Sequence, residues 1–480
     1  MRTRASRRGM RWTKWHDGVL MNFVLTILAF LAALGPLIVF HELGHYWVAR
    51  ACGVKVLRFS IGFGKPLAKI VRGRDRTEWV LAAIPFGGYV AMLDEREVDA
   101  TQIAPADLAR AFNRQPVWKR IAIVAAGPFA NLLLAIALYA GIDLHGVEEP
   151  RALFATPTAD SAPARAGIAT PYEVVALDGE PIRSLVDLRW RLLKIGVDRG
   201  QARLAARVAN GETRNIDLDL SGFATRDLES DFMQKVGLTV ARPRPTIREV
   251  VDANGPAARA GLQAGDRIVA NGGKNVDDAD AVYRAISKSP GKPLAMAIER
   301  DGVPLATNVI PNATPSDAPN DAAGAAPGTR IGRVGIKLGA QFPTTLVRYG
   351  PIGAITHATV QTWDLCVFSV RMIGKMLSGE LSLSNISGPV TIADYAGQSA
   401  RLGPLAFITF IAFISISLGV MNLLPVPMLD GGHLLYYFAE IVRGRPPSDR
   451  FLEWSQRAGM FVLAGLMMVA LFNDFARLLS

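Results

Sequence analysis

His41-Glu42-Leu43-Gly44-His45 follows directly on an uncharged run from Leu20 to Phe40. A run of this length can cross a bilayer as one helix. Histidines four residues apart lie on the same face of a helix, so His41 and His45 can bind one metal ion from the same side. Ionisable groups at the edge of a membrane span are costly and are usually functional. The sequence therefore predicts a metal site at the end of a membrane-spanning helix.

Glu42 is the candidate general base of this site. The pattern His-Glu-x-x-His on a helix is typical of zinc peptidases. Zinc lowers the pKa of a bound water to about 7, and a carboxylate beside the ligands can accept the proton. The alternative is a pair of helix-facing histidines that bind only backbone or carboxylate groups. The membrane placement favours the metal site with Zn2+.

Zinc needs a third protein ligand, which must come from elsewhere in the chain. The extended metalloprotease pattern would place it at Val48 or Ala51, and neither side chain can bind metal. The strongest distant candidate is the segment 422–433, Asn-Leu-Leu-Pro-Val-Pro-Met-Leu-Asp-Gly-Gly-His, which ends a second uncharged run. Spacing alone leaves Asp430 and His433 as alternatives.

These motifs, together with others along the chain, resemble the site-2 protease family of intramembrane zinc metalloproteases. Within the family, the chain is most similar to the bacterial branch that carries two periplasmic PDZ domains. The resemblance covers nearly the whole chain from about Met21 and includes Phe59-Ser60-Ile61-Gly62-Phe63-Gly64, Pro85-Phe86-Gly87-Gly88-Tyr89, Ala125-Ala126-Gly127-Pro128-Phe129-Ala130-Asn131, Ser387-Gly388-Pro389-Val390 and Leu429-Asp430-Gly431.

The resemblance implies roles for particular residues. It implies that Asp430 is the third zinc ligand, with His433 as the alternative. It also implies that Asn422 and Pro425, which precede the ligand, help to hold substrate. Asn131 has two open interpretations, a hydrogen bond near the zinc or simple helix packing.

The expected fold is a polytopic α-helical membrane protein with four transmembrane helices, a membrane-associated β-hairpin region and two periplasmic PDZ domains of the α+β class. The expected order is a basic extension (1–20), the first transmembrane helix with the histidine motif (20–51), a cytoplasmic-side hairpin and loop region (52–118), the second transmembrane helix (119–142), two PDZ domains (143–223 and 224–311), a linker (312–330), an amphipathic membrane-surface helix and loop (331–401), the third transmembrane helix with the Leu-Asp-Gly motif (402–442), a cytoplasmic loop (443–457) and the fourth transmembrane helix (458–477).

An internal repeat supports the two PDZ domains. Residues 161–168, Ser-Ala-Pro-Ala-Arg-Ala-Gly-Ile, recur as Gly-Pro-Ala-Ala-Arg-Ala-Gly-Leu at 255–262. Each copy predicts a short helix, a turn and a strand. The second copy continues with Gly265 and Asp266 in the turn, and the first copy lacks both. PDZ grooves bind extended peptides by strand addition, and the functional interpretation is a filter that screens substrates by the size of their outer part. A spacer that never binds peptide is the alternative that remains open.

Charge predicts the orientation in the membrane. The chain carries a net charge of +11, and its basic residues concentrate between Cys52 and Arg120 and again between Arg443 and Arg457. Both segments would face the cytoplasm by the positive-inside rule. The chain would then lie in a bacterial inner membrane, with the repeats in the periplasm. Such clusters suit anionic lipid headgroups of the bilayer. Without a recognisable nucleic-acid-binding fold, we expect no nucleic-acid partner.

The first 20 residues conflict with this orientation, because they are strongly basic and would lie outside. We interpret them as an extension upstream of a true start near Met21. A cleaved signal peptide is the alternative, and we reject it because cleavage would separate the span from its motif.

Two further segments have predicted structures. Leu67–Val71, a turn at 72–75 and Trp79–Ile84 read as a β-hairpin, whose edge could hold an unwound substrate strand; a plain surface hairpin is the alternative. Tyr349–Leu377 reads as an amphipathic helix on the membrane surface, with His357 on its polar face rather than at a metal.

The predicted function is an intramembrane zinc metalloendopeptidase that cleaves single-span membrane proteins. By resemblance, its substrates are anti-sigma factors of the envelope stress response, already trimmed by another protease, and leftover signal peptides. The alternative is a catalytically inactive membrane scaffold that presents PDZ domains. The motif residues His41, Glu42, His45 and Asp430 favour the enzyme, since a scaffold needs none of them.

Overall fold

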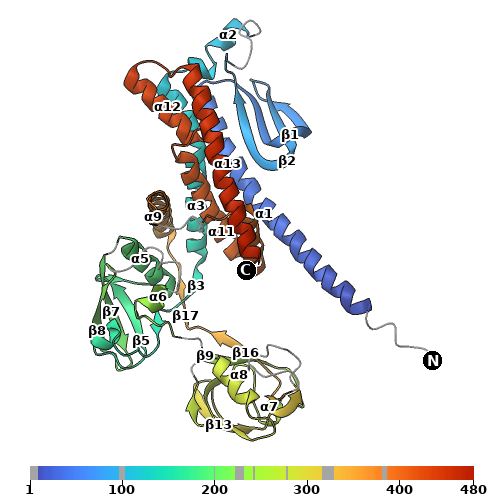
Figure 1. Ribbon diagram of the computed structural model, residues 1–480, viewed down its shortest axis with the longest axis vertical. Helices are drawn as coiled ribbons and strands as arrows, with labels where there is room; N and C mark the ends of the chain where they lie inside the picture. The colour runs from blue at the N-terminus through green and yellow to red at the C-terminus, as the bar shows by residue number, and fades with distance from the viewer. Residues whose placement is uncertain are drawn as a thin grey trace, which may run out of the picture. The chain divides into compact units, whose positions relative to one another are not determined.

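The computed structural model describes residues 9–96, 103–198, 200–221, 232–241, 244–276, 279–315, 329–380 and 386–479. The chain forms two compact units (Figure 1). One unit comprises Met1–Val147 and Arg348–Ser480, and the other comprises Glu148–Val347. The first unit contains the histidine motif and the apolar segments, and the second contains the two repeats.

Among the described residues, four helices of the first unit are long and apolar enough to cross a membrane. They are α1 (Gly9–Ala51), α3 (Val117–His145), α11 (Pro404–Leu423) and α13 (Asp449–Leu479). The expectation of four apolar helices is confirmed. Residues 9–20 of the expected basic extension form the first part of α1.

Helix α3 contacts α1 and α11. Small residues allow α1 and α3 to approach at backbone distance, since a Cβ on Gly44 would lie only 2.3 Å from the carbonyl oxygen of Ala126. Small residues at crossings are the usual means of close helix packing in membranes. The turn of α1 that follows His41 is thereby held against the middle of α3.

The segment after α11 breaks the expected third transmembrane region into two helices. Helix α11 ends at Leu423, and a separate helix, α12 (Asp430–Arg443), begins after six residues that include Pro425 and Pro427. Proline lacks the backbone donor that would continue a helix. The chain is also tightly folded here, because a Cβ on Gly431 would lie 2.1 Å from the carbonyl oxygen of Leu424. The break places Asp430 at the start of α12.

The predicted hairpin is present, with longer strands than expected. Strands β1 (Val56–Arg72) and β2 (Thr77–Met92) pair in antiparallel register around a turn at 73–76. The part nearest α1 is packed, with Phe59 buried against Tyr46 and Trp79. The part nearest the turn is mostly exposed. The connection to α3 contains α2 (Pro105–Leu108) and a short 3-10 helix (Phe112–Arg114).

The first unit also contains α9 (Pro351–Leu377) and α10 (Pro389–Leu402). Helix α9 packs on α3, and α10 packs on α1, α11 and α13. His357 of α9 lies 2.7 Å from a carboxylate oxygen of Asp143, and its ring stacks on Tyr349 at 4.3 Å between centroids. His357 therefore pairs with a carboxylate on α3 and is not part of the group formed by His41, His45 and Asp430.

The second unit contains one sheet for each repeat. The first sheet has the order β4 (Leu153–Phe154), β5 (Tyr172–Leu177), β7 (Gln201–Val208) and β8 (Thr213–Asp219), with β6 (Glu180–Pro181) beside β5. The second has the order β13 (Val303–Val309), β12 (Leu294–Arg300), β10 (Arg267–Asn271), β9 (Arg244–Val250) and β16 (Ile336–Gln341), with β11 (Lys274–Asn275) beside β10.

Each repeat forms the helix, turn and strand that its sequence predicts. Helix α4 (Ala162–Arg165) precedes β5 in the first copy, and α7 (Pro256–Arg259) precedes β10 in the second. A longer helix packs on each sheet, α5 (Leu185–Val197) and α8 (Ala279–Ser287). Each repeat has its own apolar core, built around Leu188 and Leu204 in the first and Ile247 and Ile268 in the second.

The boundaries of the repeats differ from those expected. The core of the first repeat extends past 223 to α6 (Phe232–Lys235). The second sheet includes β16, which lies beyond the expected end at 311, because its antiparallel pairing with β9 completes the sheet. The ends of the expected linker are paired strands, β14 (Asn312–Pro315) and β15 (Arg330–Arg333). Residues 316–328 of that linker lie outside the described residues. A final pair, β3 (Val147–Pro150) and β17 (Thr344–Val347), joins the two ends of the unit.

Candidate metal centre

His41 and His45 lie one turn apart on α1 and present their rings to each other. The two Nε2 atoms are 3.2 Å apart, and the ring planes meet edge to face with centroids 4.8 Å apart. Both side chains are largely removed from solvent. The spacing in the sequence therefore produces the shared face that it predicted.

Asp430 meets this pair from α12. Its Oδ2 atom lies 3.2 Å from the Nε2 of His41 and 3.6 Å from the Nε2 of His45. The carboxylate also sits in the first turn of its helix, where the helix dipole favours negative charge. Among the described residues, His41, His45 and Asp430 form a group whose ligand atoms all lie within 4.8 Å of one another.

His433 is not part of this group. It lies in the first turn of α12 after Asp430, with its ring 6.0 Å from that of Tyr436. Of the two alternatives that the spacing left open, the fold brings the carboxylate to the histidine pair.

The donor set fits zinc. Ligand atoms about 2.0–2.1 Å from a tetrahedral ion lie about 3.3 Å from one another, close to the separations observed here. His45 also has its second nitrogen engaged, because its Nδ1 lies 2.8 Å from the carbonyl oxygen of Ile123. A carbonyl only accepts hydrogen bonds, so the proton of His45 resides on Nδ1 and the Nε2 lone pair is free for a metal.

Gly127 of α3 provides the space in front of the histidines. A Cβ at this position would lie 2.2 Å from the Nε2 of His45 and 2.8 Å from the Cε1 of His41. Any side chain here would therefore enter the volume that a metal ion shared by the two histidines needs. The absence of a side chain on α3 is part of what makes the site accessible to an ion.

Glu42 lies between the metal ligands and the hairpin. Its side chain is buried, and its Cγ is 3.0 Å from the position that a Cβ of Gly88 would occupy. The backbone of β2 thus passes directly beside the candidate base. A carboxylate in this place can accept a proton from a water at the metal site.

Asn422 and Pro425 flank the break between α11 and α12. Asn422 is half-buried in the last turn of α11, and Pro425 is exposed in the connecting segment. Asn422 precedes Asp430 by eight residues and Pro425 precedes it by five. Their role in holding substrate stays a prediction.

Two residues of α3 at this site, Gly127 and Asn131, had no firm role from the sequence. Asn131 is fully buried, with its side-chain nitrogen 3.3 Å from the Nδ1 of His41. Gly127 and Asn131 are four residues apart within a candidate span, so both lie on the face of α3 toward α1. That spacing, joined to the position of a polar residue within an apolar helix, is the signal that could have found them.

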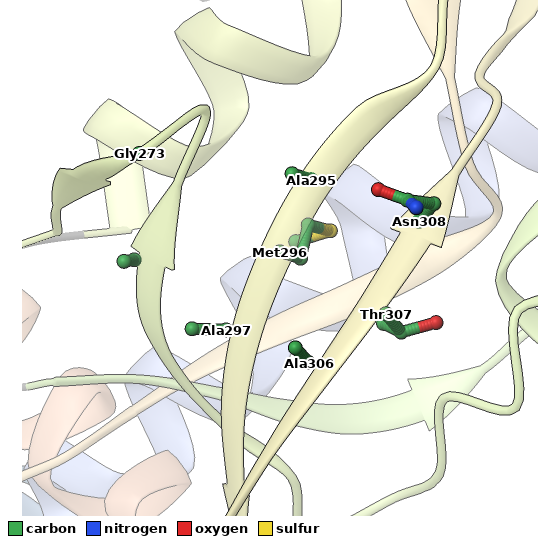
Figure 2. A pocket seen from close by; sticks show the side chains of 8 residues that line it. Gly273, Ala295, Met296, Ala297, Ala306, Thr307 and Asn308 are labelled. Carbon is green, nitrogen blue, oxygen red and sulfur yellow. The ribbon is translucent and has the colours of Figure 1, made fainter.

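The second unit contains a hollow that has no comparable chemistry. It lies on the second sheet, over β10, β12 and β13 (Figure 2). Its lining residues carry no titratable side chain, and they are Ala270, Gly273, Ala295, Met296, Ala297, Ala306, Thr307 and Asn308. This surface offers neither a metal ligand nor a general base.

Comparison with known proteins agrees with the chemistry of the site. The sequence profile of peptidase family M50 matches residues 29–466. A protein of Ralstonia nicotianae, named as a candidate zinc metalloprotease, is 44% identical over 464 residues, which are 95% of this chain and 99% of that protein. The regulator of sigma-E protease RseP of Escherichia coli is 41% identical over 467 residues, 96% of this chain and 100% of its own. Protease RseP of Yersinia pestis is 40% identical over 461 residues, with 96% and 100% covered.

The family profile and the relatives each cover most of the chain, and the match includes the histidine motif and the segment around Asp430. The Ralstonia relative is named as a candidate zinc metalloprotease, which agrees with the preference of the donor set for zinc. The chain therefore belongs to peptidase family M50, the site-2 proteases, and is a zinc metalloprotease with helices that cross the membrane.

Proposed function

We propose that this protein carries out regulated intramembrane proteolysis, the hydrolysis of a peptide bond within or next to the membrane-spanning segment of another protein. One observation carries the proposal. The ligand group joins α1, a candidate span, to the start of α12, which directly follows a second candidate span. A hydrolytic site at this place would meet peptide bonds that soluble proteases do not reach.

The side chains have distinct roles in this proposal. His41, His45 and Asp430 hold the zinc ion. When bound, zinc polarises the scissile carbonyl and acidifies a water molecule. Glu42 accepts the proton of that water and delivers it to the leaving amine. Burial of Glu42 beside β2 keeps the proton transfer away from bulk solvent.

The hairpin is proposed to present the substrate as a strand. A helical substrate hides its peptide bonds in its own hydrogen bonds and must unwind before hydrolysis. Residues 58–61 of β1 pair with β2 on both sides, with 78–81 and with 88–91. Among the described residues, the edges of this sheet without a neighbouring strand are therefore those of 66–72 and 88–92. An unwound segment could add to such an edge, and Asn422 and Pro425 would hold it near Asp430.

The two sheets of the second unit are proposed to be PDZ domains. Strand β16 ends the strand order of the second sheet and so offers an edge for an added peptide. These domains would act as a filter that screens substrates by the size of their outer part, and a spacer that never binds peptide is the alternative.

The orientation follows from charge. The chain is a multi-pass protein of the inner membrane, like its regulator of sigma-E relatives. We place the hairpin and the segment between α12 and α13 on the cytoplasmic side, because both are rich in Lys and Arg. The second unit is then periplasmic and the active site lies toward the cytoplasm. Anti-sigma factors are the proposed substrates, with leftover signal peptides as a second class.

Substitution of Glu42 by Gln tests this function. The amide keeps the shape of the side chain and removes its ability to accept a proton, so the variant should retain zinc and lose cleavage of a tagged single-span protein. Zinc content is measured on the same preparations. Equal cleavage by the wild type and the variant would exclude Glu42 as the base. Loss of zinc from the variant would mean that the side chain supports the metal site instead.

A further inference from the structure

Asn131 has an unusual environment for a polar side chain. It is fully buried in α3, a candidate membrane span. Its Nδ2 lies 3.3 Å from the Nδ1 of His41, and its Oδ1 is buried with no hydrogen-bond partner among the described residues. A buried amide whose oxygen accepts no hydrogen bond is destabilising. An apolar side chain of similar size would avoid that penalty, so the amide needs another explanation.

Packing between helices does not supply that explanation. The hydroxyl of Ser415 on α11 donates to the backbone carbonyl oxygen of Asn131 at 2.8 Å. Any residue at position 131 has this carbonyl. The contact between α3 and α11 therefore does not depend on the amide side chain.

The chemistry of His41 explains why position 131 carries an amide. A neutral imidazole has one donor and one acceptor nitrogen. The Nε2 of His41 faces Asp430 and His45, and its Nδ1 faces Asn131. If Nε2 binds a metal, the proton must reside on Nδ1 and needs an acceptor. His45 meets the same requirement with the carbonyl of Ile123.

We propose that Asn131 is a positioning residue that serves both tautomers of His41. When Nε2 binds zinc, the Oδ1 of Asn131 accepts the Nδ1 proton. When Nε2 carries the proton and donates it toward Asp430, the Nδ2 of Asn131 donates to Nδ1, as in the arrangement described above. The two ends of an amide have nearly the same shape. A half-turn about the Cβ–Cγ bond therefore exchanges them without moving α3.

The two histidines thus differ in what holds them. The Ile123 carbonyl can only accept, so it fixes His45 in the tautomer that binds metal. Asn131 can accept or donate, so His41 can exchange its Nε2 bond to Asp430 for a bond to zinc. This role rests on the proposed metal centre, and it explains why an amide is present where the neighbouring packing needs no polar group.

Zinc affinity tests the proposal directly, without any need for turnover. The full-length chain is purified in detergent, and its zinc dissociation constant is measured by competition with a chelator for the wild type, Asn131→Leu, Asn131→Ala and Asn131→Asp. The Leu and Ala variants have no acceptor for the Nδ1 proton and should bind zinc about 10- to 100-fold more weakly. The Asp variant accepts only, which suits the zinc-bound tautomer, and should bind at least as tightly as the wild type.

Ser415→Ala is the matched control. It removes the hydrogen bond to the backbone of Asn131 and leaves the amide in place, so its zinc affinity should equal that of the wild type. A thermal unfolding curve for each variant separates packing from metal binding. Wild-type zinc affinity in both the Leu and Ala variants, with lowered unfolding temperatures, would assign Asn131 to packing and overturn the proposal. A weakened Asp variant that remains folded would overturn it as well.

A separate variant distinguishes this proposal from the metal centre on which it rests. His45→Ala removes one of the three ligands and should abolish tight zinc binding. If that variant binds zinc as the wild type does, the metal centre itself is misassigned. If it loses zinc while Asn131→Ala keeps the wild-type affinity, the centre stands and only the role of Asn131 fails.

Discussion

Arg120 of α3 and Glu440 of α12 form an ion pair with an Nη2–Oε1 distance of 2.6 Å, and each side chain is only 12% exposed. The guanidinium of Arg120 also lies over the ring of Tyr437, 4.9 Å from its centroid. At 1.5 Å per residue, Glu440 lies about 15 Å along α12 from Asp430. The pair therefore holds the far part of the helix whose first residue faces the histidines.

Removal of one partner of this pair should loosen α12. Glu440→Ala leaves the Arg120 guanidinium largely buried without its carboxylate, a change that typically costs about 3 kcal/mol or more. We expect a lower unfolding temperature and weaker zinc binding, because Asp430 loses its support. The exchanged pair, Arg120→Glu with Glu440→Arg, should recover part of both. A single variant that keeps the wild-type unfolding temperature and zinc affinity would show that the pair does not position Asp430.

Gly127→Ala should disable the metal centre with little change elsewhere. The added methyl would lie 2.2 Å from the Nε2 of His45, so the ring must move away from Asp430. We expect a loss of zinc and at least about a 100-fold loss of cleavage, in line with the effect of misplacing a reacting group by an ångström.

Gly141→Ala provides the matched control on the same helix, because a Cβ at that position would meet no atom within 4 Å. It should keep both zinc and activity. An active, zinc-loaded Gly127→Ala protein would mean that the space in front of the histidines is not needed.

Asp474 should stabilise α10 from another helix. Its carboxylate on α13 accepts from the backbone N–H groups of Gly388, Val390 and Thr391 at 2.9, 2.9 and 3.2 Å. The first N–H groups of a helix have no partner within it, and the structure gives α10 no side-chain cap of its own. Asp474→Ala is expected to cost about 1–3 kcal/mol and to raise hydrogen exchange at the start of α10.

Asp394→Ala is the control, since that aspartate is exposed on α10 itself. It should change neither the unfolding temperature nor the exchange rate. Equal hydrogen-exchange rates at the start of α10 in the two variants would show that Asp474 does not stabilise this helix.

The second repeat should lose stability in acid through Asp266. Burial acts to raise the pKa of this carboxyl, but hydrogen bonds from the Arg300 guanidinium at 2.7 and 2.8 Å and from the N–H of Gln263 at 2.8 Å outweigh it and hold the pKa below its usual value. A lowered pKa in the folded state means that the unfolded state binds more protons in acid. The stabilisation is therefore present above the ordinary Asp pKa of about 3.9 and is lost as the pH falls through the folded value.

Thermal unfolding of residues 148–347 against pH checks this expectation. Asp266→Asn should flatten the decline in acid, because the amide does not titrate. Asp301→Asn, in the exposed turn between β12 and β13, should retain the decline of the wild type. An unchanged acid profile in Asp266→Asn would assign the decline to other carboxyl groups.

From residue spacing alone, the sequence predicted the two histidines of the metal site but not its third ligand. The spacing of His41 and His45 determines that they share a helix face, because a helix has a fixed period. For the third ligand, spacing left Asp430 and His433 open, and only the resemblance to the family favoured the carboxylate. The break after Leu423 determines which of the two side chains reaches the histidines. It makes Asp430 the first residue of α12, whereas the ring of His433 lies beside that of Tyr436.

The limits of the repeats were harder to predict, for a related reason. Each copy of the repeat predicts its own helix, turn and strand, because these depend on residues that are close together in the chain. Strand β16 joins the second sheet by pairing with β9, which lies far away in sequence. No local pattern reports such a partner, so the expected boundary fell short of it.

By itself, the sequence determined the elements whose causes are local, namely the apolar helices, the hairpin, the two repeats and the paired histidines. Tertiary structure decided what these elements meet. It brought Asp430 to the histidines, and it placed Gly127 and Asn131 of α3 against the two sides of the same pair. Local periodicity fixes which face a residue occupies, but only the packing of one helix on another fixes which atoms fill the space in front of that face.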